Sequence, residues 1–255
     1  MKRLMILLLA LMTLLSAASA EELLTLAEPL EGVICWPDGT NEDTASYVYR
    51  YCYPQVAGES EIAEQINGTY AYEVDDAYDF RVPMNAEGLD LDAGMQFFTS
   101  IGYEITCLNE HYLSVKITSE SFLGYSLTTT IAGHTFTLDD GAKTGSVTSL
   151  PYLLGILDGD DAKDEWMKDR QTARADECVR KLIWEIIEQQ IMRGEVAYYD
   201  DLDYEMFCDN FYPEEAFYLN ADGDPVFFIQ EGFVAPVAEG VLLFPFTMEE
   251  LLDEI

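Results

Sequence analysis

The chain has few basic residues and almost no histidine. Its 255 residues include 13 Lys and Arg, 48 Asp and Glu and only two His, which gives a formal net charge of −35. Binding to nucleic acid needs clustered cations that neutralise phosphates, so this composition argues against a nucleic-acid partner. The acidity indicates either colloidal solubility or attraction of a cationic partner or of metal ions.

A second long apolar run is missing after the first twenty residues. Lys2 and Arg3 precede the apolar run 4–15, which is too short to span a bilayer comfortably, and Ala18-Ser19-Ala20 follows it. This order is typical of a secretory signal. We therefore expect cleavage after Ala20 and a soluble, secreted mature chain that does not span a membrane; the alternative is an uncleaved anchor.

The cations of the mature chain are unevenly distributed. Without Lys2 and Arg3 it carries 11 basic against 48 acidic residues, a formal net charge of −37. Seven of these basic residues lie in one largely helical segment, whereas residues 194–255 contain sixteen acids and no Lys, Arg or His. We expect this segment to form a negatively charged surface on which Asp200, Asp201 and Asp203 bind a partner.

Cysteines are few and lack the spacing of a metal or redox site. The five are Cys35, Cys52, Cys107, Cys178 and Cys208. None belongs to a Cys-x-x-Cys pair, and their odd number leaves at least one thiol unpaired or intermolecular. A hairpin centred between Asp43 and Thr44 places Cys35 opposite Cys52, so we expect a disulfide between these two.

Motifs of the common enzyme classes are also absent. The sequence has no His-x-x-His or His-Glu-x-x-His spacing, Gly-x-Ser-x-Gly elbow, P-loop or dinucleotide fingerprint. The acid runs 90–92 and 158–161 suggest calcium, but Lys163 occupies the position where a calcium loop starting at Asp158 requires Gly. We expect no catalytic residue, metal or cofactor, although pairs among the many carboxylates leave glycoside hydrolysis open.

The first half of the chain predicts a hairpin, a helix and a meander. Strands are expected over 31–36 and 46–53, the second with a row of four tyrosines on one face, for which half-buried packing is the expected role. Ser60 is positioned to cap a helix over 60–74, which makes its Asn67-Gly68-Thr69 glycosylation pattern a chance match. The meander strands are expected over 95–108, 111–119, 122–131 and 135–138.

The second half predicts a long helix and a small sheet. Apolar residues keep helical spacing over 172–193, and Gly194 ends this helix. Two short strands, 217–219 and 226–229, flank an Asp-Gly turn, and the second is apolar at every position, as in an inner strand. After a strand over 241–246, the capping box that starts at Thr247 opens a last helix.

Residues 211–255 clearly resemble domain of unknown function 3298, and residues 45–145 resemble it loosely. The matching stretches are Phe217-Tyr218-Leu219, Asp222-Gly223, Val226-Phe227-Phe228 and residues 232–240, where Ala235-Pro236 is followed by Gly240. A weaker resemblance, to domain of unknown function 4163, rests on Tyr53-Pro54-Gln55 and Ile66-Asn67. The chain departs from the first family at residues 124–127, which replace a Gly-Ala-His element, so a function tied to that histidine is not expected.

The first family is the extracellular domain of the lysozyme-sensing anti-sigma factor V, and it also occurs beside peptidoglycan deacetylases. The resemblance implies a receptor or a companion of cell-wall enzymes. We expect a stand-alone, non-enzymatic binding or sensing module of the bacterial envelope, whose partner is a basic protein such as lysozyme, or peptidoglycan. The alternative is a cell-wall glycan hydrolase.

These patterns together predict an α+β fold in two sequential parts. The expected division is a signal peptide over 1–20, an N-terminal part over 21–145 and a C-terminal part over 146–255. In each part an antiparallel sheet alternates with helices, and one long helix is expected to cover the sheets.

Overall fold

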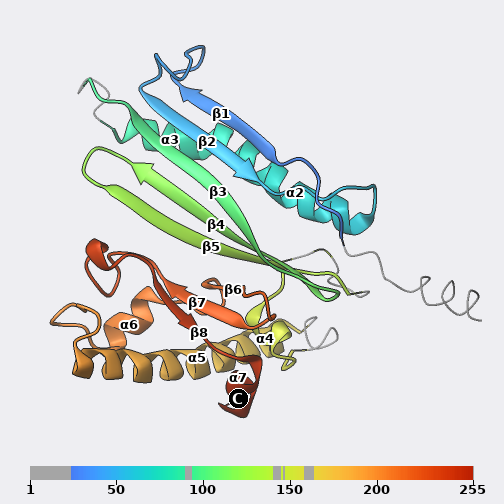
Figure 1. Ribbon diagram of the computed structural model, residues 1–255, viewed down its shortest axis with the longest axis vertical. Helices are drawn as coiled ribbons and strands as arrows, with labels where there is room; N and C mark the ends of the chain where they lie inside the picture. The colour runs from blue at the N-terminus through green and yellow to red at the C-terminus, as the bar shows by residue number, and fades with distance from the viewer. Residues whose placement is uncertain (1–23, 90–93, 140–144, 146, 158–163, 255) are drawn as a thin grey trace, which may run out of the picture.

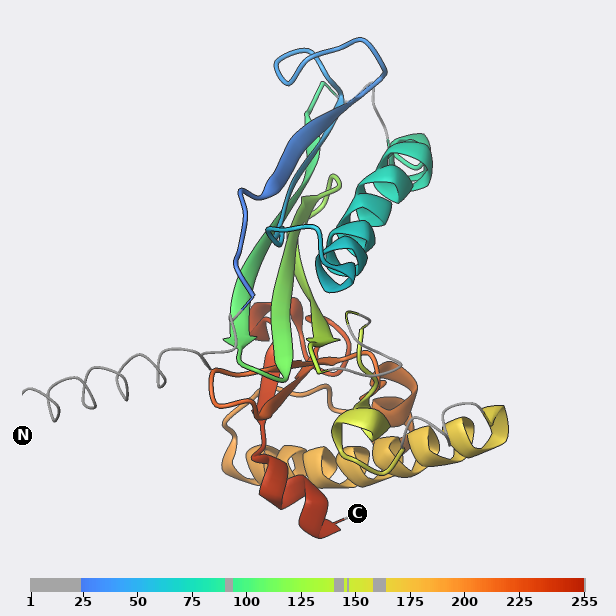
Figure 2. The same cartoon turned by 90° about the vertical axis from the view of Figure 1, so that its right-hand side faces the viewer.

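The computed structural model describes residues 24–89, 94–139, 145, 147–157 and 164–254. The expected signal peptide and the acid runs 90–92 and 158–161 lie outside these residues. Within the described part, two sheets and their helices form the α+β fold that the sequence predicts (Figure 1, Figure 2). A search of the described helices finds none with the length and apolar character needed to cross a membrane.

The larger sheet has five strands in the order β1-β2-β3-β4-β5. The strands are β1 (Leu30–Trp36), β2 (Tyr47–Tyr53), β3 (Phe97–Leu108), β4 (Tyr112–Phe122) and β5 (Leu127–Thr137). Neighbours are antiparallel except β2 and β3, which pair in parallel over four residues of each strand, from Tyr47↔Phe97 to Arg50↔Ser100. The sheet is therefore mixed and not purely antiparallel, because a helical connection returns the chain to enter β3 in the direction of β2.

One face of this sheet is covered by its own helical layer, formed by α2 (Glu61–Asp76), the π-helical turn η1 (Ala77–Arg81) and α3 (Val82–Glu87). Helix α2 begins as predicted, with the Ser60 hydroxyl accepting a hydrogen bond from the Ala63 amide at 3.2 Å. The tyrosine row of β2 faces this layer, and the rings of Tyr53 and Tyr70 stack at 5.3 Å. The row is packing, as expected, but the expectation that one long helix covers both sheets is wrong.

The smaller sheet is antiparallel, in the order β6-β7-β8. Its strands and the helices around it are β6 (Phe217–Leu219), β7 (Pro225–Ile229), β8 (Leu242–Pro245), α4 (Leu150–Leu153), α5 (Glu165–Arg193), α6 (Tyr204–Asn210), η4 (Val237–Glu239) and α7 (Met248–Glu254). Every residue of β7 is buried, which confirms the predicted inner strand. The Thr247 amide donates to the Glu250 carboxylate and the Glu250 amide to the Thr247 hydroxyl, so the capping box is also confirmed.

Helix α5 lies across the smaller sheet (Figure 1). Its buried residues are Ala175, Val179, Ile183 and Ile187, which join the core formed with β6, β7 and β8. The helix ends at Gly194, whose φ of 64° is left-handed as predicted, but it begins at Glu165 and not at residue 172. Its first turns are mostly exposed, so the apolar period that reveals a helix in the sequence is missing there.

The two sheets meet where β6 packs against β5. A Cβ atom on Gly133 of β5 would clash with the Phe217 carbonyl oxygen of β6, so this approach depends on glycine. The predicted strand break between residues 131 and 135 is accordingly wrong, because β5 continues through Gly133 to Thr137. The Ser114 hydroxyl of β4 adds a bond, accepting from the Leu219 amide at 2.9 Å. The division at 145/146 remains a prediction.

Candidate functional site

The three aspartates predicted to bind a partner lie around the connection between α5 and α6. Asp200 and Asp201 are exposed in a turn. Asp203 is exposed too, but its carboxylate accepts a hydrogen bond from the Met206 amide at 2.8 Å and caps α6. Asp203 therefore has a structural role that its sequence context did not reveal, which leaves Asp200 and Asp201 as the freer carboxylates.

Helix α5 brings cations to the segment 194–255, which has none of its own. Arg193 lies 3.7 Å from the Glu195 carboxylate. Arg180 donates from Nε to the Phe211 carbonyl at 3.0 Å, and its guanidinium lies 5.6 Å from the centre of the Tyr212 ring. The acidic segment is thus partly balanced in space although it is unbalanced in sequence.

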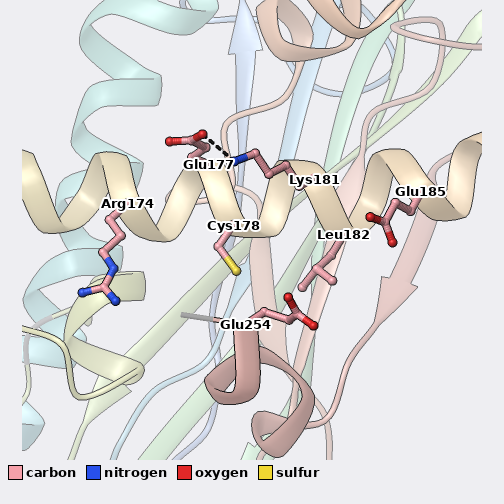
Figure 3. A pocket seen from close by; sticks show the side chains of 7 residues that line it. All are labelled: Arg174, Glu177, Cys178, Lys181, Leu182, Glu185 and Glu254. Atoms are coloured by element: carbon pink, nitrogen blue, oxygen red, sulfur yellow. Dashed lines mark hydrogen bonds and ion pairs between the residues drawn. The ribbon is translucent and has the colours of Figure 1, made fainter.

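A pocket of about 250 Å³ lies between α5 and α7 (Figure 3). Its lining residues are Arg174, Glu177, Cys178, Lys181, Leu182, Glu185 and Glu254. Figure 3 shows that Lys181 is held by Glu177, with 2.6 Å between Nζ and Oε1. Charges of both signs line this pocket, so it has no clear preference for a cationic ligand.

The thiol of Cys178 in this pocket is not an activated nucleophile. Burial and the carboxylate of Glu254 raise the pKa of the thiol, while Lys181 and Arg174 offset this only in part. A thiol with a raised pKa stays protonated near neutral pH, whereas the thiolate is the reactive form. The arrangement therefore favours an inert cysteine.

A larger pocket of about 580 Å³ lies beside β1 on the larger sheet. Its lining residues are Val33, Ile34, Cys35, Asp38, Gly39, Thr40, Tyr51, Val74, Asp75 and Tyr78. They come from β1, from the loop that follows it, from β2 and from the junction of α2 and η1. Two carboxylates and two phenols thus share the pocket with apolar side chains, and no Lys or Arg lines it.

The cations near this second pocket are already engaged. Residues 24–89 contain 13 acidic residues and two basic ones, Arg50 and Arg81. Arg50 lies 2.9 Å from the Glu42 carboxylate, and Arg81 lies 2.7 Å from those of both Glu73 and Asp76. Within the part of the chain that the structure describes, Asp38 and Asp75 have no ion pair, so a cation would find them uncompensated.

The predicted disulfide between Cys35 and Cys52 does not form, because the hairpin has a different register. Cys35 pairs with Val48, whereas Cys52 pairs with Glu31, four residues further along β1. At about 3.3 Å per residue this offset is roughly 13 Å, beyond the reach of a disulfide. All five cysteines are free thiols.

The register differs because Asn41 organises the turn. Its side-chain oxygen accepts from the backbone amides of Asp43 and Thr44 at 3.1 and 3.2 Å. The pairing of Trp36 with Tyr47 centres the hairpin between Asn41 and Glu42, two residues before the predicted centre. An Asx turn of this kind was the signal in the sequence that could have fixed the register.

The two histidines have different surroundings. His111 is exposed and lies 2.8 Å from the Asp139 carboxylate, measured from Nδ1. His134 is largely buried beside Tyr70 and Phe136, and burial lowers the pKa of its imidazole. Among the described residues, no group of three His, Cys, Asp or Glu side chains is placed to hold a metal ion.

The sequence predicted the exposed acidity but not the pocket beside β1. Asp38 follows an edge strand and Asp75 lies near the end of α2, so no spacing in the sequence connects them. That they line one pocket depends on the hairpin register and on the position of α2 over β1 and β2. The hairpin register predicted from the sequence was wrong.

Comparison with solved structures finds members of the family that the sequence resembles. A member of the domain of unknown function 3298 family from Bacteroides fragilis aligns over 89% of this chain and 92% of its own, with 12% identity and a TM-score of 0.49. A protein of the same family from Pseudomonas aeruginosa aligns over the same shares, with 12% identity and a TM-score of 0.43. No family model matches the sequence. No curated protein matches it either.

Proposed function

We propose that the mature protein is a secreted, non-enzymatic binding or sensing module of the bacterial envelope whose partner is cationic. The observation that carries this proposal is the pocket beside β1, where Asp38 and Asp75 lack counter-charges while Arg50 and Arg81 are held by other carboxylates. A basic extracellular protein, lysozyme-like by the family resemblance, fits this pocket better than neutral glycan does. The chain is exported by cleavage after Ala20.

Electrostatic attraction of such a partner acts mainly on the rate of encounter. A net charge of −37 on the mature chain accelerates association with a cation, and salt weakens the attraction because the Debye length is only about 8 Å at physiological ionic strength. Association should therefore slow strongly with salt, while dissociation changes less.

The test is surface-based binding of the mature protein to lysozyme across a salt series. Asp38→Asn with Asp75→Asn should weaken binding at low salt at least tenfold, and Asp200→Asn with Asp201→Asn should weaken it less. Glu185→Gln with Glu188→Gln, two exposed changes on α5, is the control for loss of two charges. Absence of lysozyme binding at low salt would exclude lysozyme as the partner. If all three variants weaken binding equally, no particular carboxylate binds the partner, and the acidity serves solubility.

A glycan hydrolase is the second candidate, because Asp38 and Asp75 line one pocket and glycosidases use two carboxylates. A general acid of this class lies in a site that excludes water, whereas both of these side chains are exposed. Release of reducing ends from peptidoglycan by the mature protein, lost in Asp38→Asn and in Asp75→Asn, would favour this candidate over binding alone.

A further inference from the structure

The two sheets have four outer edges, and three of them are protected. A bare edge exposes backbone N–H and C=O groups that can pair with another chain, and proteins usually block it. Strand β8 has only four residues and ends in Pro245, which has no N–H to donate. Strand β6 packs against β5, and its Leu219 amide donates to Ser114.

The outer edge of β5 is protected by side chains that take the place of a strand. The side-chain amide of Gln230 donates from Nε2 to the Ile131 carbonyl at 2.6 Å, and its Oε1 accepts from the backbone N–H of Ile131 at 3.0 Å. The Glu231 carboxylate accepts from the Thr129 amide at 2.7 Å. One end of the larger sheet is thus closed by specific contacts.

Among the residues that the structure describes, none gives the edge at β1 a device of this kind. Among the described strands, β1 is the outermost of the larger sheet and pairs only with β2, without a bulge (Figure 1). Its sequence is Leu-Glu-Gly-Val-Ile-Cys-Trp, which has no proline, no lysine and a single charge at Glu31. Val33, in its middle, is 43% exposed. By the usual criteria this strand is an open template for pairing.

The pocket with Asp38 and Asp75 lies along this edge. Consecutive β1 residues line it, namely Val33, Ile34 and Cys35. Successive side chains of a strand point to opposite faces, so a cavity that touches all three extends around the strand edge. Val74 and Asp75 of α2 and Tyr78 of η1 also line the pocket. The pocket is therefore a groove between a free strand edge and a helix.

We propose that β1 accepts an extended segment of a cationic polypeptide as a sixth strand of the larger sheet, with a Lys or Arg side chain of that segment held by Asp38 and Asp75. Backbone pairing supplies affinity in this mode of recognition, and the pocket beside the strand supplies specificity. The inference rests on the proposed function for the sign of the partner's charge, and it adds how the partner is held.

Charge selects this occupant over a second copy of the chain. Pairing of β1 with β1 would join two molecules that each carry a formal net charge of −37 in the mature form. It would also leave both pockets without a cation. A segment that carries Lys or Arg supplies the missing counter-charge.

The test uses a pool of capped octapeptides with Lys or Arg fixed near the centre and Val, Thr, Ile or Ser elsewhere. The tightest member is then made in two further forms, each N-methylated at alternate residues so that one edge or the other cannot pair. Binding is measured at low salt by calorimetry, and hydrogen exchange is followed for the β1 amides.

We expect one methylated form to bind at least tenfold more weakly and the other to bind like the parent, with slower exchange in β1. Asp38→Asn with Asp75→Asn should weaken the parent peptide at least tenfold but leave the difference between the methylated forms. Asp200→Asn with Asp201→Asn is the matched control and should change little.

Three outcomes would overturn the proposal. Equal binding of both methylated forms would show that the peptide does not pair with β1 as a strand. If that binding still weakened on substitution of Asp38 and Asp75, the proposed function would be unaffected. Failure of every peptide in the pool to bind would show that β1 does not accept extended cationic segments, whether or not the protein binds lysozyme. Sedimentation that shows a dimer at micromolar concentration, with β1 amides protected in the absence of peptide, would assign the edge to a second copy.

Discussion

The side chain of Gln230 pairs with both backbone groups of Ile131, donating to the carbonyl at 2.6 Å and accepting from the amide at 3.0 Å. These two residues lie 99 positions apart, so the bond pair fastens the C-terminal part of the chain to the last strand of the larger sheet. The arrangement gives the first prediction.

Gln230→Ala should lower the free energy of unfolding by about 1–3 kcal/mol, because two partly buried backbone groups of Ile131 lose their partner. Urea denaturation measures the change. Gln189→Ala on α5 is the control, since Gln189 is exposed, and it should shift the midpoint little. An unchanged midpoint for Gln230→Ala would show that water replaces the side chain without loss.

Gly133→Ala should be strongly destabilising, by at least about 2 kcal/mol, because the new methyl group meets the backbone carbonyl of Phe217, which cannot rotate away. Gly102→Ala, on β3 of the same sheet, is the matched control, because a Cβ there has no atom within 4 Å. That change should be neutral or stabilising by up to about 1 kcal/mol. Similar melting temperatures for the two variants would contradict the close approach of β5 and β6.

Asn67 fixes the chain before α2 and should not carry a glycan. Its side chain accepts from the Val56 amide at 2.8 Å and donates to the Val56 carbonyl at 2.9 Å. Asn67→Ala should therefore cost about 1–3 kcal/mol of stability. Thr69→Ala, which removes the glycosylation pattern but keeps Asn67, should cost much less. A stable Asn67→Ala protein, or a glycan mass on the wild type, would contradict this role.

Stability should fall as pH drops from 7 to 5.5, in part through His134. Burial lowers the pKa of this imidazole below its usual value of about 6.5, and Glu73 offsets the shift only in part. As the pH falls through this range, the imidazole is protonated in the unfolded chain but stays neutral in the folded chain. This difference favours unfolding by up to about 1.4 kcal/mol per pH unit.

Unfolding free energies measured for His134→Phe between pH 5.5 and 7 should show a smaller slope than the wild type. His111→Gln, a change at the exposed histidine, serves as the control. Its slope of unfolding free energy against pH should exceed that of His134→Phe by as much as the wild-type slope does. If the slopes of wild type and His134→Phe coincide, His134 is not the titrating group.

Local signals in the sequence predicted much of the fold. The cap at Ser60, the left-handed Gly194, the inner strand at Val226–Ile229 and the capping box at Thr247 each depend on a few neighbouring residues, and each was predicted. The start of α5 was missed because its first turns bury little. The register of β1 was missed because Asn41, and not the midpoint between two cysteines, sets the turn.

The candidate site was out of reach for a different reason. Asp38 and Asp75 become neighbours of one groove only after β1, β2 and α2 have packed. Conversely, Asp203 looked like a free acid in a cation-free segment, but its carboxylate caps α6. Charge can be counted from sequence, whereas the partners of each charge depend on the tertiary structure.

The parallel pairing of β2 with β3 has a consequence for how the chain folds. Hairpins β1–β2, β3–β4 and β4–β5 join strands that follow one another, whereas the bond from the Tyr47 hydroxyl to Thr99 spans 52 residues and requires α2 to be in place. Contacts of such sequence separation form late, since loop closure precedes any gain from pairing. Stopped-flow refolding should therefore respond weakly to Tyr47→Phe, which removes the bonds of this hydroxyl to Thr99 and Asn85, while the unfolding rate rises. We therefore expect the larger sheet to assemble from two pieces that form separately and join last.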